Sequence, residues 1–96
     1  MLNPAIIEHK LNELKPVLSS RFYVNKIGYF GSYATGDFSE KSDLDILIHL
    51  SQPLGWEFFD LQEFLQKELN ITIDLVSVNA LKEQMKASIL SQVKYI

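Results

Sequence analysis

Residues 31–45 read GSYATGDFSEKSDLD, and they join two apolar segments of the chain. A Gly-Ser turn, Gly31 and Ser32, ends the first segment, and Asp43 and Asp45 begin the second. A glycine turn lets backbone N–H groups and a neighbouring hydroxyl approach phosphate oxygens closely. Two aspartates at alternate positions of a strand share one face, with Cα atoms roughly 6–7 Å apart, and can converge on a divalent cation. The stretch therefore predicts a site for a metal ion and a nucleotide.

The segments around this stretch have the pattern of short strands. We expect strands over residues 26–30, 43–50 and 71–76, with a short helical turn over 33–36 and a polar loop over 37–42. In the second strand, alternation divides the side chains between a face that packs on helices (Leu44, Ile46, Ile48, Leu50) and a face that opens onto a cleft (Asp43, Asp45, Leu47, His49). No role is assigned to His49.

The third strand contains one carboxylate, Asp74, in the apolar sequence ITIDLV. An isolated carboxylate inside an apolar strand costs several kcal/mol unless it is paired or coordinates a metal. The alternative is an aspartate at a strand end that accepts hydrogen bonds from loop N–H groups. Asp74 is therefore a candidate third ligand for the metal ion.

Three helices complete the expected fold. The first begins at Asn3 and Pro4 and repeats leucine and isoleucine at helical spacing, and Pro16 should kink or split it. The second covers residues 56–69, with its aromatic side chains, Trp56 and Phe59 included, expected in the core. The third runs from Asn79 to about residue 91, and the last four residues, VKYI, are a terminal strand or part of a partner surface. This order predicts one α/β (α+β) domain over residues 1–96, a small mixed β-sheet with helices packed on one face.

Composition limits the possible functions. The chain has 96 residues, a net charge of −3 and no cysteine, so we expect neither disulfides nor direct nucleic-acid binding. No apolar run reaches the ~20 residues of a membrane span, and the N-terminus lacks a signal-peptide pattern. We expect a cytoplasmic protein without membrane contact.

The combination of Gly31-Ser32, Asp43-Leu44-Asp45 and Asp74 resembles the signature of the DNA polymerase beta-like nucleotidyltransferases. It is most similar to their smallest branch, the minimal nucleotidyltransferase (MNT) domain. The resemblance implies that Asp43, Asp45 and Asp74 hold two Mg²⁺ ions and that Asp74 helps deprotonate an attacking hydroxyl. It also implies that Gly31 and Ser32 position the β- and γ-phosphates of ATP. Ser42, directly before the aspartate pair, is a further candidate for the nucleotide site.

Stand-alone proteins of this branch pair with HEPN-domain ribonuclease toxins and transfer AMP from ATP to a tyrosine of the toxin. The resemblance therefore implies a protein adenylyltransferase that acts as an antitoxin and forms a hetero-oligomer with a HEPN protein. Two alternatives remain open. One is a weak or inactive module that neutralises its partner by binding alone, favoured by Thr35, where many relatives have arginine. The other is a nucleotidyltransferase subunit for a small molecule of the aminoglycoside type.

Overall fold

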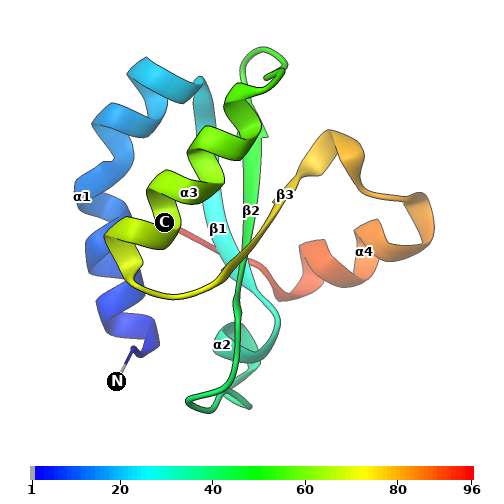
Figure 1. Cartoon of the computed structure of the whole chain (residues 1–96). Coiled ribbons are helices and arrows are strands. Elements are labelled where there is room, and N and C mark those ends of the chain that lie inside the picture. Colours follow the sequence, from blue (N-terminus) through cyan, green and yellow to red (C-terminus); the bar gives the residue numbers. More distant parts are fainter. Residues whose placement is uncertain (1) are drawn as a thin grey trace.

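The computed structural model describes residues 2–96 and contains a four-stranded mixed sheet (Figure 1). The strands are β1 (Val24–Phe30), β2 (Leu44–Leu50), β3 (Ile73–Ser77) and β4 (Lys94–Tyr95), in the order β3-β2-β1-β4. β1 pairs antiparallel with β2 and with β4, whereas β2 and β3 are parallel. The predicted mixed sheet is confirmed, and the terminal VKYI segment supplies its fourth strand.

Helices lie on both sides of this sheet (Figure 1). α1 (Pro4–Phe22) and α3 (Glu57–Leu69) cover one face, and α4 (Glu83–Gln92) packs on the other. Two shorter elements, α2 (Ser32–Thr35) and the 3₁₀ turn η1 (Val78–Ala80), follow β1 and β3. The expectation that helices pack on one face holds for α1 and α3 and was wrong for α4. Leu47 is fully buried on the second face of β2, so that face needs an apolar cover of its own.

α1 is one continuous helix. The Asn3 side chain accepts a hydrogen bond from the Ile6 N–H at 3.0 Å, and Pro4 occupies the first helical position, as expected. Pro16 lies within the helix without splitting it, so of the two expected effects, a kink or a split, the split was wrong. The helix ends at Tyr23, whose left-handed backbone returns its N–H to the Leu18 carbonyl.

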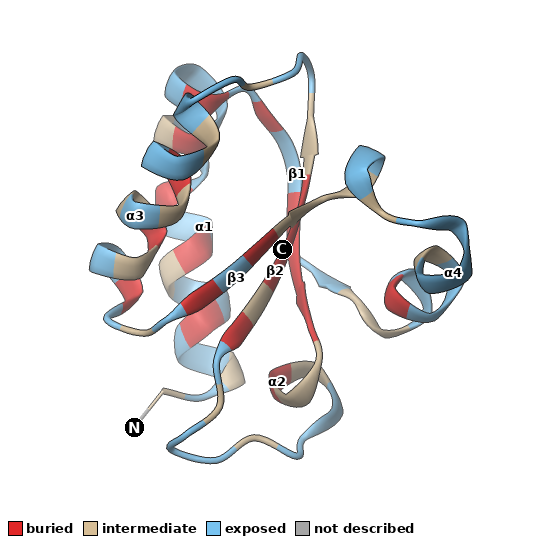
Figure 2. Cartoon of the chain, turned by 45° about the vertical axis from the view of Figure 1, so that its right-hand side comes forward, coloured by how far each residue is buried: buried red, intermediate tan, exposed pale blue. Residues whose placement is uncertain are grey.

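Two clusters of buried side chains form the core (Figure 2). The larger lies between the sheet and α1 and α3, and includes Leu11, Ile46 and Leu65. The smaller joins α4 to the opposite face through Ile89, Phe30 and Leu47. The two clusters bury apolar surface on both faces of β2, one of the two inner strands of the sheet.

The aromatic side chains at the start of α3 lie outside this core. Trp56 is 84% exposed and Phe59 is 60% exposed, so the expectation that they are buried was wrong. The inward face of α3 carries Leu61, Leu65 and Leu69 at helical spacing. Phe59 is two residues before Leu61, which places it about 200° around the helix from that face, since each residue turns about 100°.

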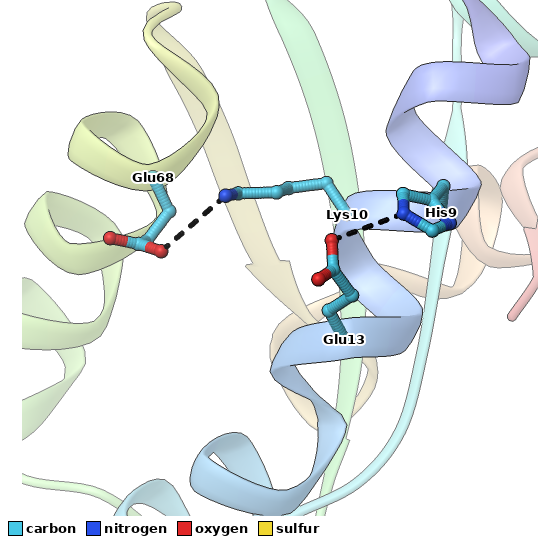
Figure 3. Close-up of polar contacts among 4 residues, drawn as sticks. All are labelled: His9, Lys10, Glu13 and Glu68. Atoms are coloured by element: carbon cyan, nitrogen blue, oxygen red, sulfur yellow. Dashed lines mark ion pairs between the residues drawn. The ribbon is translucent and has the colours of Figure 1, made fainter.

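Ion pairs between and along the helices are exposed (Figure 3). Lys10 of α1 reaches Glu68 of α3 with 3.9 Å between Nζ and Oε1, and His9 lies 3.3 Å from Glu13 one turn away. Exposed pairs of this kind contribute about 0–1 kcal/mol, so the packing of α1 on α3 rests on the apolar contacts beneath them. Within residues 2–96, no helix is long and apolar enough to cross a membrane.

Candidate active site

The candidate site forms where β1 ends and where β2 and β3 begin. In the parallel register of β2 and β3, Asp45 lies opposite Asp74. In the antiparallel register of β1 and β2, Asp45 lies opposite Phe30, the residue before Gly31. Asp43 directly precedes β2. The sheet thus brings the Gly-Ser turn and two of the three predicted carboxylates to one place, with the third two residues away along the chain.

Gly31 lies directly against the carboxylate of Asp45. Its backbone angles are φ 70° and ψ −149°, a conformation that side chains of L-residues rarely adopt. A β-carbon on residue 31 would also overlap Oδ2 of Asp45. Both the backbone conformation and the missing side chain are therefore required for the turn and the carboxylate to occupy this space together.

The turn continues into α2, a single helical turn. The Gly31 carbonyl accepts hydrogen bonds from the N–H groups of Ala34 and Thr35, both at 3.0 Å. Tyr33 is 2% exposed and stacks on Phe38 with ring centroids 4.6 Å apart, which fixes α2 to the loop that follows. Ser32 is the first residue of α2, so its N–H has no acceptor within the helix. Its N–H and hydroxyl are suitable donors for a phosphate oxygen.

Gln92, at the last position of α4, also contacts the turn. Its Oε1 accepts a hydrogen bond from the Gly31 N–H at 3.3 Å. The two residues are 61 positions apart, and no pattern in the sequence links them. Sequence reasoning did not include Gln92 in the site.

Burial and the neighbouring carboxylates both act on Asp45. Burial raises the pKa of Asp45 from 3.8 to about 6, helped by the charge of Asp74, a hydrogen bond with the Asp74 carboxyl group, and the charge of Asp43. Asp74 is itself exposed, although its neighbours Ile73 and Leu75 are buried. Asp74 therefore lies within an apolar strand, as expected, but its side chain is not buried, because the alternation of β3 turns it away from the core.

The side chains fit a Mg²⁺ site by their chemistry. Carboxylate oxygens are the ligands that Mg²⁺ prefers, and a cation would offset the repulsion by Asp74 and Asp43, which adds to the effect of burial on the pKa of Asp45. Within residues 2–96, however, no three Asp, Glu, His or Cys side chains are already gathered around one ion position. The carboxyl groups of Asp45 and Asp74 are instead close enough to share a proton in a hydrogen bond, which adds to the raised pKa of Asp45. The role of the three aspartates as metal ligands stays a prediction.

Ser42 has a structural contact in the loop before β2. Its hydroxyl oxygen accepts a hydrogen bond from the Ser39 N–H at 2.9 Å. Thr35, on the other side of the loop, donates its hydroxyl to Asp37 at 3.3 Å. These bonds shape the segment that leads into Asp43, and nucleotide contact by Ser42 stays a prediction.

Comparisons with known proteins show which family the chain belongs to. Residues 11–96 match the nucleotidyltransferase domain family. The protein adenylyltransferase MntA of Thermococcus cleftensis is 38% identical over 97 residues, which cover 100% of this chain and 98% of the relative. A relative from Methanocaldococcus jannaschii is 37% identical over 92 residues, covering 94% of each protein.

Solved structures have the same fold. A toxin–antitoxin complex with AMP-PNP superposes with a TM-score of 0.78 and 25% identity, covering 92% of this chain and 70% of that chain. A structure assigned to the minimal nucleotidyltransferases gives a TM-score of 0.83 at 21% identity, covering 97% and 95%. The resemblance in the Gly-Ser and aspartate motifs thus extends over the whole domain, and the chain belongs to the nucleotidyltransferase domain family.

Proposed function

We propose that this nucleotidyltransferase is a Mg-ATP-dependent protein adenylyltransferase that acts as an antitoxin. It transfers AMP to a tyrosine of a partner HEPN ribonuclease toxin, with which it forms a hetero-oligomer. The observation that carries the proposal is the contact of Gly31 with Asp45 beside Asp74, which joins a phosphate-binding turn to a pair of carboxylates.

The relatives support the kind of transfer and the kind of partner. MntA of Thermococcus cleftensis, 38% identical, is a protein adenylyltransferase. One structural neighbour is a toxin–antitoxin complex with AMP-PNP, and another, at 24% identity, is a tri-AMPylated HEPN toxin of Shewanella oneidensis with its MNT antitoxin. ATP as donor and a HEPN protein as acceptor are therefore the substrates that we propose for this chain.

The residues of the site divide the work of the transfer. Gly31 allows the turn to lie directly against the Asp45 carboxylate, and Ser32 would donate hydrogen bonds to phosphate oxygens of the triphosphate. Asp43, Asp45 and Asp74 would hold two Mg²⁺ ions, which supply positive charge to the attacking and leaving oxygens. Asp74 is exposed and so accessible to an acceptor hydroxyl, whose proton it can receive. The tyrosine oxygen bonds to the α-phosphorus, the bond to the β-phosphate oxygen breaks, and pyrophosphate leaves.

A growth assay separates this function from neutralisation by binding alone. The HEPN protein encoded beside this chain would be expressed with the wild type or with the Asp43→Asn, Asp45→Asn double variant. We expect rescue of growth by the wild type only, because the double variant lacks two of the three carboxylates. Glu40→Gln, an exposed change in the same loop, is the matched control and should rescue fully.

Binding alone is the second candidate function, because Thr35 leaves α2 without a cation. Under that function the double variant would rescue growth as well as the wild type does. Co-purification of the two proteins must accompany the assay, so that loss of rescue is not caused by loss of the complex.

A further inference from the structure

Gln92 binds the backbone N–H of Gly31, the polar group of this residue that α2 does not bind. The Gly31 carbonyl is held by the N–H groups of Ala34 and Thr35, whereas its N–H points to Gln92 Oε1 at 3.3 Å. A backbone N–H can only donate, so the orientation of the Gln92 amide is set by this bond, with Oε1 toward Gly31. Gly31 is thus bonded at both its N–H and its carbonyl, and its Cα lies against Asp45.

The same face of α4 provides the apolar contact next to this hydrogen bond. Ile89 is the only buried residue of α4 and packs on Phe30 and Leu47. Ile89 and Gln92 are three residues apart, so they lie on one side of the helix. Phe30 directly precedes Gly31, and Leu47 is on the strand that carries Asp45. α4 is therefore attached to the sheet at the candidate nucleotide site.

We propose that Gln92 is a positioning residue for the nucleotide. It holds the Gly31 backbone in the conformation that places the turn, with Ser32, directly beside the Asp45 carboxylate. Without this acceptor, Gly31 has other backbone conformations available, because glycine is the least restricted residue. The turn would then have to become ordered when a nucleotide binds, and this entropic cost would weaken binding. This role extends the nucleotidyltransferase site itself and does not depend on the identity of the partner.

Nucleotide binding by the isolated chain tests the proposal. Gln92→Leu keeps most of the side-chain volume and removes the acceptor, and we expect the Kd of Mg·AMP-PNP to rise about tenfold. Gln84→Leu, at an exposed position of the same helix, is the matched control and should leave Kd within about twofold of the wild type. Backbone amide exchange of Gly31, measured by NMR without nucleotide, should become faster in Gln92→Leu only.

The outcomes separate positioning from a structural role. A residue that only stabilises the fold would lower Tm in Gln92→Leu and leave Kd unchanged, and that result overturns the proposal. Unchanged exchange of the Gly31 amide, or no binding by the wild type, overturns it too. The binding assay needs no partner protein, so its result is independent of AMP transfer. If the wild type binds nucleotide here but transfers no AMP when the HEPN protein is supplied in a separate assay, the proposed function is contradicted and the role of Gln92 is intact.

Discussion

Gly31 is enclosed by Asp45, Gln92 and the first turn of α2. Gly31→Ala places a β-carbon against the Asp45 carboxylate in an unfavourable backbone conformation, so we expect loss of about 2–3 kcal/mol of stability and of nucleotide binding. Gly36→Ala is the matched control: its φ is 95°, yet nothing lies within 4 Å of the added carbon. It should cost about 1 kcal/mol and leave nucleotide binding intact. Chemical denaturation and AMP-PNP titration measure both effects, and equal losses in the two variants would contradict the steric argument.

The raised pKa of Asp45 predicts that its ionised carboxylate destabilises the ligand-free protein at neutral pH. Folding favours the protonated carboxyl, so its contribution is full below pH 3.8 and is lost as pH rises through about 6. Asp45→Asn should therefore raise Tm at pH 7.5 without added metal, and the difference should shrink by pH 4.5. Scanning calorimetry at both pH values, with Glu40→Gln as control, measures this. A variant that melts below the wild type at pH 7.5 would show that the carboxylate stabilises the fold instead.

The sequence was sufficient to identify most residues of the candidate site and insufficient to arrange them. The Gly-Ser turn and the aspartates follow a local pattern, and the structure brings Gly31, Asp45 and Asp74 together. Gln92 carries no such pattern, because its contact with Gly31 depends on how α4 packs. The exposure of Asp74 was missed for a related reason, since alternation along β3 assigns two faces without showing which one is covered.

At the scale of elements, most strands and helices could be predicted from periodicity. The errors concern which helix covers which face of the sheet. β2 and the helices α1 and α3 were expected, because their buried residues recur with the period of a strand or a helix. The position of α4 on the second face was not expected, because only Ile89 is buried among its ten residues and one residue gives no periodic pattern. The continuity of α1 through Pro16 shows that its packing on the sheet outweighs one missing hydrogen bond.

Substitutions on the buried and the exposed side of α3 should differ strongly in their effect on stability. Leu65 is fully buried between α3 and the sheet, so Leu65→Ala should destabilise the protein by about 2–5 kcal/mol. Trp56 is 84% exposed, and Trp56→Gln should change stability by no more than about 0.5 kcal/mol. Urea unfolding of the two variants measures both values. A loss above about 2 kcal/mol in Trp56→Gln would mean that the indole ring is buried in solution.

At the scale of the whole molecule, one small domain should unfold as a unit, so its Tm reports ligand binding anywhere in the fold. Mg·AMP-PNP at 100 times its Kd should stabilise the protein by about 2.7 kcal/mol, which raises Tm by roughly 10–20 °C for a domain of this size. The Asp43→Asn, Asp45→Asn variant should show no such rise. Equal rises in both proteins would place the nucleotide away from the aspartates.

The central claim is the transfer of AMP by this site to a partner protein. The most direct measurement incubates the chain with ATP labelled at the α-phosphate, Mg²⁺ and the HEPN protein encoded beside it, and reads label by gel and intact mass. We expect label on a tyrosine of the partner with the wild type and none with the Asp43→Asn, Asp45→Asn variant. No label with the wild type, while the two proteins still form a complex, would contradict the claim and leave an antitoxin that acts by binding alone.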